Sequence, residues 1–455
     1  MDGPQPHRFQ TRWTALILIA VALLLGGLAV RRAVNHNADF SGNHLNWKKN
    51  LQASFLPERR DGPEPQDPDA YPPITYALYA PLGALPLWAA ATVWFLVNLG
   101  CSFYLWRGAR NWLQIELATH PQCATYTPVT AGIWQLTRGP QRILNLAVLA
   151  ILPAWIGSLL LGQNMLPLMA LTWGAFQLAR NQRPWLAGGL LALATVLKVL
   201  PVVFLLPYVL TRNVRVVAAF TISGCLLVGG LGSLYFGPAT NREFHRKWLK
   251  FAVQGPENRE PDPRDPNTLR GSLRYKNQSI EAVLARLMMD VPIHNQPQAP
   301  RVNLTSLSAA TWRTTRSIVT AVCVMLGLFA LYRCVRQTQP RAGSDVPAPA
   351  GPMGESSVEM LAILSLLQLL ISPMVWSHYY VWLFWPWLWL QAETLCGRRG
   401  GGMIYVAWLI AMPLMAVPEV RAMGLHLWLT LALFLWICWP RLGGSTQRRG
   451  SLLTG

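Results

Sequence analysis

The stretch VRVVAAFTISGCLLVGGLGSLYF, residues Val214–Phe236, carries a single charged residue, Arg215, near one end. An apolar run of about 20 residues is long enough to cross the hydrocarbon core of a membrane as an α-helix. Residues 13–30 form a second run of this kind, without any charge. A soluble chain would interleave charges through its helices, whereas only 13% of these 455 residues are charged. The sequence therefore predicts an all-α, polytopic integral membrane protein.

Further apolar stretches follow along the chain, and together they predict about twelve membrane segments. They are residues 86–106, 143–161, 165–179, 185–210, 312–333, 358–371, 379–395, 403–417 and 423–439. Residues 185–210 are long enough for one ordinary span, which would place Arg212 and Arg215 outside. We expect instead two short helices broken at residues 198–201, because Pro201 cannot continue helical hydrogen bonding and Lys198 is costly in lipid.

The net charge of +19 raises the possibility of nucleic-acid binding. Most of the basic residues, however, lie in short loops that alternate with the apolar stretches. Examples are Arg107 with Arg110, Arg138 with Arg142, Arg180 with Arg183, Arg333 with Arg336, and Arg398 with Arg399. By the positive-inside rule these loops and both termini are cytoplasmic. This topology accounts for the charge, so we expect no nucleic-acid partner.

The same rule assigns the remaining segments to the two sides of the membrane. Residues 33–73 form a first outer loop, residues 237–311 a larger second outer loop, and residues 337–357 a flexible cytoplasmic linker rich in proline, glycine and alanine. We expect short helices in both outer loops and a single domain over residues 1–455. The first span lacks a small-residue cleavage site, so we interpret it as a retained anchor.

Short polar motifs gather on the expected outer face. Asp39 follows the first span, and Tyr71-Pro72 leads the chain back toward the membrane as an extended dipeptide. Gln163 and Asn164 lie in a tight turn between two spans, where their amides suit sugar hydroxyls or phosphate oxygens. Each motif also has a purely structural interpretation: a solvated carboxylate, a chain reversal, or a turn that satisfies itself.

Lys198 is the strongest of the remaining candidates. An ammonium in an apolar run costs about 2.5–3.5 kcal/mol on insertion scales and normally persists with an anionic partner, such as a phosphate. Trp376 and His378 stand at the outer junction of two spans, where the histidine could bind phosphate, exchange a proton or cap the interface. Asn277 and Gln278, in the second outer loop, are a weaker signal.

In this order the motifs resemble the integral-membrane GT-C glycosyltransferases of family eighty-seven, which include mannosyltransferases that use polyprenyl-phosphate mannose. The resemblance covers most of the chain. The matching residues are Asp39-Phe40, Tyr71-Pro72-Pro73, Pro81-Leu82, Gly162-Gln163-Asn164, Ala187-Gly188, Lys198, Pro201, Asn277-Gln278-Ser279, Ser372-Pro373, Trp376 and His378. Two departures bear on the acceptor: His378-Tyr379 replaces paired histidines, and residues 57–70 form an acidic, proline-rich insert.

The resemblance implies a donor in which a monosaccharide, probably mannose in this family, is carried on polyprenyl phosphate at the outer face of a bacterial plasma membrane. Asp39 would be the base that deprotonates a hydroxyl of a lipid or glycan acceptor, which attacks the anomeric carbon with inversion. Lys198 and His378 would stabilise the departing phosphate. Gln163 and Asn164 would position the donor. The residues that would shape the site are Tyr71, Pro72, Trp376, Asn277 and Gln278.

The membrane core contains no glycine-rich nucleotide loop and no Asp-x-Asp motif, so we expect no cofactor, metal or soluble nucleotide donor. An alternative function is transport or flipping of a lipid-linked or small anionic substrate, since transporters share the span number and the broken helix. A transporter should show inverted repeats and polar groups at mid-membrane. Polar motifs gathered on one face favour the enzyme.

Four basic residues of the second outer loop have two interpretations. Arg242, Arg246, Lys247 and Lys250 could contact lipid phosphates, or they could belong to a solvated amphipathic helix on the membrane surface.

Overall fold

The protein is described by a computed structural model that covers residues 7–35, 40, 41, 44, 72–119, 140–254, 275–293, 300–338, 357–395 and 401–442. All regular elements within these ranges are helical, which confirms the all-α class. Two of the candidate site residues, Asp39 and Tyr71, lie outside the described residues, as do most of the first outer loop and most of the cytoplasmic linker.

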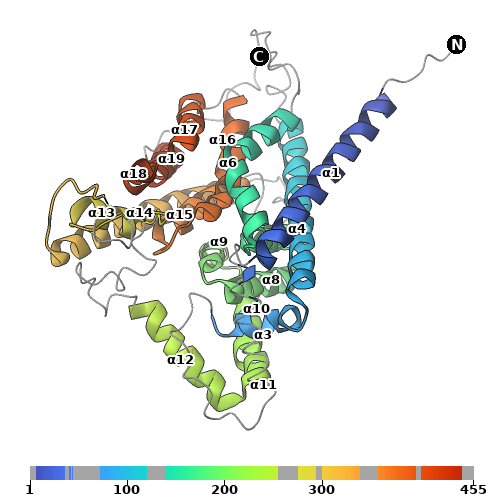
Figure 1. Ribbon diagram of the computed structural model, residues 1–455, viewed down its shortest axis with the longest axis horizontal. Helices are drawn as coiled ribbons and strands as arrows, with labels where there is room; N and C mark the ends of the chain where they lie inside the picture. Colours follow the sequence, from blue (N-terminus) through green and yellow to red (C-terminus); the bar gives the residue numbers. More distant parts are fainter. Residues whose placement is uncertain are drawn as a thin grey trace, which may run out of the picture.

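The helices follow one another with short connections. In the first half of the chain they are α1 (His7–Val34), α3 (Ile74–Gly83), α4 (Leu87–Thr119), α6 (Pro140–Leu161), α7 (Met165–Arg180), α8 (Pro184–Leu197), η2 (Leu200–Leu205), α9 (Leu206–Leu210), α10 (Val214–Cys225), η3 (Leu226–Leu231) and α11 (Gly232–Phe236). In the second half they are α12 (Pro238–Gln254), α13 (Ile280–Met288), α14 (Ala309–Thr338), α15 (Ser357–Ile371), η5 (Ser377–Leu383), α16 (Phe384–Leu395), α17 (Gly402–Leu414), α18 (Pro418–Ala422) and α19 (Leu425–Leu442). Figure 1 shows α1, α4 and α6 along one side and α13, α14 and α17–α19 along the other, with α15 and α16 between them.

Apolar helices of membrane-spanning length identify the protein as an integral membrane protein. Within the described residues four such helices are Leu87–Ile115, Gln141–Leu161, Val214–Phe236 and Ala310–Gln337. Five shorter apolar helices accompany them: Pro184–Leu197, Leu200–Leu210, Ser357–Ile371, Gly402–Leu414 and Leu425–Trp439. Large apolar side chains such as Leu226 and Leu234 are exposed on these helices, as lipid contact requires. This set does not establish twelve segments, and that number stays a prediction.

The break expected in residues 185–210 is present. α8 ends at Leu197, and Lys198 has an extended backbone with φ −163° and ψ 130°. A 3-10 helix then begins at Leu200, with Pro201 in its first turn, where a missing N–H does no harm. The prediction of two short helices in place of one continuous helix is therefore confirmed.

The centre of the molecule is built from α15, η5 and α16. Every residue of α15 except Ile371 is buried, and all but one of the η5 residues are buried. Stacked aromatic rings join this centre to earlier helices, with Trp385 on Trp173 at 4.7 Å and Trp382 on Phe204 at 5.3 Å between ring centroids. The segment that carries the Ser372–His378 motif is thus held on several sides by the rest of the fold.

Helices α8 and α10 pack unusually closely, and Gly188 makes this possible. A Cβ atom at Gly188 would overlap the carbonyl oxygen of Val216 and lie 2.7 Å from the backbone nitrogen of Phe220. Because these atoms belong to the backbone of α10, a side chain at residue 188 can be accommodated only if the helices separate.

We expect Gly188→Ala to lower the free energy of unfolding by about 1–3 kcal/mol through overpacking. Gly189→Ala is the matched control, because its Cβ would meet Ser223 Oγ at an ordinary 3.5 Å. Thermal unfolding of both variants in detergent micelles measures the difference. Equal melting temperatures for the two variants would contradict the close packing of α8 and α10.

Candidate functional site

The turn between α6 and α7 is as tight as its sequence predicts. Gly162 adopts a positive φ of 65°, and the Gln163 N–H donates a hydrogen bond to the Ser158 carbonyl oxygen at 3.0 Å. The indole N–H of Trp94 donates to the Gly162 carbonyl oxygen at 2.8 Å. A Cβ at Gly162 would lie 2.6 Å from Cβ of Phe40, so Phe40 packs directly on this turn.

Gln163 and Asn164 both carry buried side chains. Asn164 precedes the first residue of α7, yet its side chain does not cap the helix. Its Oδ1 is buried and accepts no hydrogen bond within the described part of the chain. Because a buried acceptor without a donor costs about 1–3 kcal/mol, this atom is a natural point of attachment for a ligand hydroxyl.

Lys198 is buried at the break that follows α8, and its ammonium faces an aromatic ring. The Nζ atom lies 4.1 Å from the ring centroid of Tyr379, a distance that gives a cation–π interaction. The Tyr379 ring lies in turn 5.0 Å from the ring of His378. The structure therefore brings Lys198 and His378 together around Tyr379.

Ser158 links this pair to the turn between α6 and α7. Its hydroxyl donates to the carbonyl oxygen of His378 at 3.3 Å, while its own carbonyl oxygen accepts from the N–H of Gln163. Motifs more than 200 residues apart in the sequence thus meet at a single serine.

The start of α3 closes the other side of the site. Pro72 is buried, and its carbonyl oxygen accepts from the N–H of Thr75 at 2.9 Å. The Thr75 hydroxyl donates to the carbonyl oxygen of Val196, two residues before Lys198, at 3.2 Å. Further along α3, Tyr79 meets Trp94 edge to face at 5.1 Å. Helix α3 therefore contacts both the Lys198 break and the helix that holds the Gly162 turn.

Asn277 joins the second outer loop to the segment before η5. Its Nδ2 donates to the Pro373 carbonyl oxygen at 3.1 Å, and its Oδ1 accepts from the N–H groups of Val375 at 2.8 Å and Ser279 at 3.0 Å. The N–H of Gln278 donates to the Val375 carbonyl oxygen at 2.8 Å. These contacts make Asn277 a structural clip for the segment that carries His378.

Gln278 and Trp376 hold the two ends of this connection. The Gln278 side-chain amide donates to the carbonyl oxygens of Tyr275 at 2.7 Å and Arg421 at 2.8 Å. Half-buried Trp376 immediately precedes η5, and its carbonyl oxygen accepts from the N–H of Tyr379 at 2.9 Å.

Sequence reasoning missed Arg286, which is fully buried on α13. Its Nε donates to the Ala422 carbonyl oxygen and its Nη2 to the Asn277 carbonyl oxygen, each at 2.8 Å. Burial, followed by the nearby charge of Arg421, lowers the pKa of Arg286 to about 9, so it stays charged at neutral pH. The available signal was an arginine on the apolar face of a short amphipathic helix.

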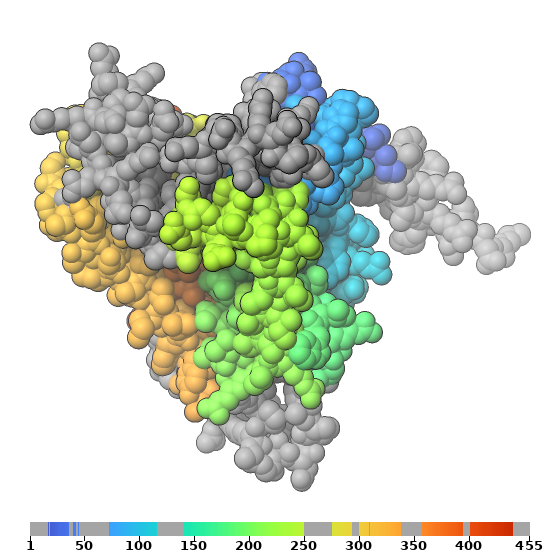
Figure 2. Space-filling model, turned by 90° about the horizontal axis from the view of Figure 1, so that it is seen from below, coloured from blue at the N-terminus to red at the C-terminus, as the bar shows by residue number. Residues whose placement is uncertain are grey.

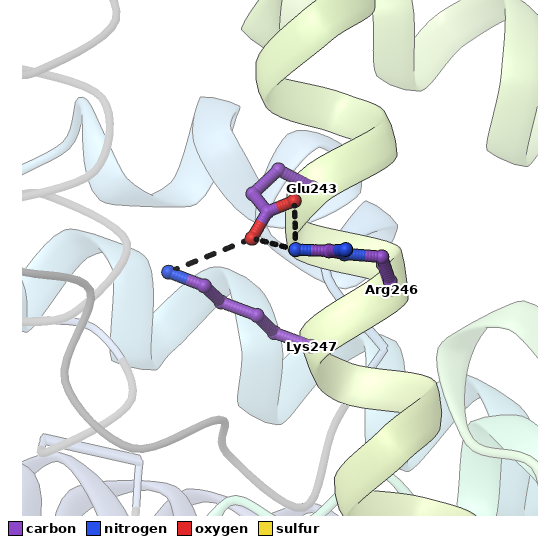
Figure 3. A network of polar contacts seen from close by, with 3 residues as sticks. All are labelled: Glu243, Arg246 and Lys247. Carbon is purple, nitrogen blue, oxygen red and sulfur yellow. Dashed lines mark hydrogen bonds and ion pairs between the residues drawn. The ribbon is translucent and has the colours of Figure 1, made fainter.

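The basic residues of α12 form ion pairs on the surface. Arg246 lies 3.0 Å and Lys247 3.8 Å from carboxylate oxygens of Glu243 (Figure 3). The hydrogen bond from Arg246 holds the pKa of Glu243 below its usual value. Figure 2 shows α12, in yellow-green, as a band on the outside of the molecule. These contacts favour the solvated helix over a cluster of lipid-phosphate ligands.

Metal ligation finds no obvious place among these groups. In the ranges that the structure describes, histidine, cysteine, aspartate and glutamate side chains do not form a cluster of three or more that could hold an ion.

These features define an all-helical integral membrane protein with a compact set of buried polar residues where α6, α7, α8 and η5 meet. Residues 70–346 match the sequence profile of glycosyltransferase family 87, and this match covers more than half of the chain. The chain therefore belongs to glycosyltransferase family 87, which confirms the resemblance. Gln163, Asn164, Lys198 and Asn277 lie within the matched residues, whereas His378 lies beyond them.

One curated relative is the polyprenol-phosphate-mannose-dependent alpha-(1-2)-phosphatidylinositol mannoside mannosyltransferase of Mycolicibacterium smegmatis. It is 24% identical to this chain over 267 residues, which cover 57% of this chain and 50% of that protein. The match thus spans half the length of the relative. No solved structure matches the chain.

We expect Asn277→Ala to destabilise the protein strongly, because it removes three hydrogen bonds and leaves buried backbone groups unpaired, at about 1–3 kcal/mol each. Asn303→Ala is the control, since Asn303 makes one exposed hydrogen bond to Ser306 at 3.3 Å. Unfolding in detergent measures both effects. A melting temperature for Asn277→Ala as high as that of Asn303→Ala would show that Asn277 is not a clip.

Proposed function

We propose that the protein is an inverting membrane glycosyltransferase that moves a monosaccharide, in the first instance mannose, from a polyprenyl-phosphate donor to a lipid or glycan hydroxyl. Membership of family 87 supports the reaction class. The observation that carries the proposal is the buried ammonium of Lys198 beside Tyr379 and His378, next to the amides of Gln163 and Asn164. A buried cation beside hydrogen-bonding amides suits a sugar phosphate attached to a lipid.

In this proposal Lys198 stabilises the leaving group. When the bond between the anomeric carbon and the phosphate oxygen breaks, negative charge grows on the polyprenyl phosphate. A fixed cation in a water-poor site opposes that charge more strongly than water does, and it needs no reorganisation during the reaction. His378, held by Ser158 and next to the same tyrosine ring, donates a second hydrogen bond to the phosphate.

Asp39 is the proposed catalytic base. It would remove the proton from the acceptor hydroxyl as that oxygen attacks the anomeric carbon from the side opposite the phosphate, which inverts the configuration. Phe40, the next residue along the chain, packs on the turn that carries Gln163 and Asn164, which supports this role.

The remaining residues have positioning roles in the proposal. The unpartnered Oδ1 of Asn164 accepts a hydrogen bond from a sugar hydroxyl, and Gln163 assists it. The frame of the site is formed by Tyr71, Pro72, Trp376, Asn277 and Gln278. Asn277 acts on the chemistry only through the segment leading to His378.

We also infer the membrane arrangement that this reaction needs. The proposal is a GT-C fold of about twelve segments forming one domain, with the site on the outer face of a bacterial plasma membrane and outer loops at residues 33–73 and 237–311. The linker at residues 337–357 is cytoplasmic. The alternation of apolar stretches with arginine-rich loops supports this arrangement.

We expect Asp39→Asn to lower the transfer rate by about 10²–10⁴-fold, the usual contribution of a general base, without loss of donor binding. Asp61→Asn is the matched control, because it makes the same change in the proline-rich insert of the same outer loop. The assay follows radiolabelled mannose from polyprenyl-phosphate mannose into membrane lipid or glycan, with purified protein in lipid.

Full activity of Asp39→Asn would remove this residue from the role of base. Absence of transfer from every polyprenyl-phosphate sugar, together with movement of such lipids across vesicles, would favour the transporter.

We expect Lys198→Met to reduce kcat by about 10²–10³-fold, since it keeps the length of the side chain but removes the charge that stabilises the leaving phosphate. Lys276→Met is the control, because Lys276 also faces a tyrosine ring, Tyr275, at 5.9 Å but is exposed. Single-turnover transfer rates measure the effect. An unchanged rate in Lys198→Met would exclude this residue from the chemical step.

A further inference from the structure

A cavity of about 420 Å³ lies between α4 and α7, away from the proposed active site. Its polar lining comes from Arg107, Asn111, Gln177 and Arg180, and its inner wall includes the indoles of Trp112 and Trp173. The volume falls within the range of about 300–1,000 Å³ that holds small ligands.

The cavity is separated from the candidate active site by more than half the length of both helices. Trp94, which binds the Gly162 turn, precedes Arg107 by thirteen residues on α4, and Asn164 precedes Gln177 by thirteen residues. At 1.5 Å per residue this is roughly 20 Å along each helix. A ligand in the cavity would therefore not touch Lys198 or His378.

The inner wall of the cavity is rigid. A Cβ at Gly108 would overlap the indole nitrogen of Trp173, so this glycine lets the indole lie against the backbone of α4. The other face of Trp173 stacks on Trp385, with ring centroids 4.7 Å apart. Trp173 is thus fixed between two elements, and the space beside it is part of the folded structure.

The lining is basic and lacks a counter-ion. Two arginines and two amides line the cavity, and none of its lining residues is acidic. Within the residues that the structure describes, neither Arg107 nor Arg180 forms an ion pair. Guanidinium groups bind phosphate through paired hydrogen bonds, so an anionic phosphate is the complementary ligand.

The rim of the cavity is apolar and faces outward. Phe103 and Ile115 line the cavity, and their side chains are 59% and 50% exposed. They stand on a helix long and apolar enough to cross a membrane, Leu87–Ile115. A ligand with a phosphate group and attached acyl chains would match both the basic interior and this rim, whereas free phosphate would match only the first.

The arginines also indicate the side of the membrane. Arg107 and Arg180 belong to the basic ends of α4 and α7, which the positive-inside rule assigns to the cytoplasmic side. Anionic phospholipids of the cytoplasmic leaflet attract basic residues near its surface.

We propose that the cavity between α4 and α7 binds the phosphate headgroup of an anionic phospholipid of the cytoplasmic leaflet, with its acyl chains lying along Phe103 and Ile115. The bound lipid would join the two helices at the end opposite the site of sugar transfer.

The test is native mass spectrometry of the full-length protein after titration with phosphatidylglycerol or phosphatidylcholine. Three proteins are compared: the natural chain, Arg107→Gln with Arg180→Gln, and a control with Arg110→Gln and Arg183→Gln. The control removes the same charge from the same region, but neither residue lines the cavity. We expect tight retention of one phosphatidylglycerol, weakened by about thirtyfold in the cavity variant and less than threefold in the control.

Competition identifies the source of the phosphate. Water-soluble sn-glycerol-3-phosphate and inorganic phosphate, added at millimolar concentration, should leave the bound phosphatidylglycerol in place. Displacement by either soluble ion would overturn the lipid assignment. Equal retention of phosphatidylcholine, or equal weakening in both double variants, would overturn the cavity as a specific anionic site.

Discussion

The buried ammonium of Lys198 is the constraint around which the polar centre is organised. A charge within an apolar helical region is expensive, and here the helix ends directly before it. The break turns the side chain toward Tyr379, whose ring offers a favourable face at 4.1 Å. Because Tyr379 belongs to η5, the lysine and the segment from Ser372 to His378 have to be held together by the rest of the fold.

Two sets of hydrogen bonds hold that segment. Ser158 binds the backbone of His378 from the α6 side, and Asn277 binds the backbone of Pro373 and Val375 from the outer-loop side. Between them, α15 and α16 are buried in an aromatic core. The polar side chains are therefore positioned by rigid elements, which is the condition for electrostatic stabilisation of a transition state.

Several local features could be predicted from residue chemistry alone. The break at Lys198 followed from a proline and a lysine in an apolar run, and the tight turn at residues 162–164 followed from the short connection between two spans. The partners of Asn277 could not be predicted, because they are backbone atoms almost 100 residues away. Arg286 was missed for the same reason: its bonds to the carbonyl oxygens of Ala422 and Asn277 leave no pattern in the sequence.

The sequence by itself determined the class of protein, the apolar segments, the basic loops and the order of the polar motifs, because hydropathy, charge and proline act locally along a chain. Only the tertiary structure decided which motifs meet. The contact between Lys198 and Tyr379, the bridge of Ser158 and the basic cavity between α4 and α7 all depend on how helices pack against one another. Packing is set by the shapes of side chains from distant segments, such as Gly108 against Trp173, and no single stretch of sequence contains that information.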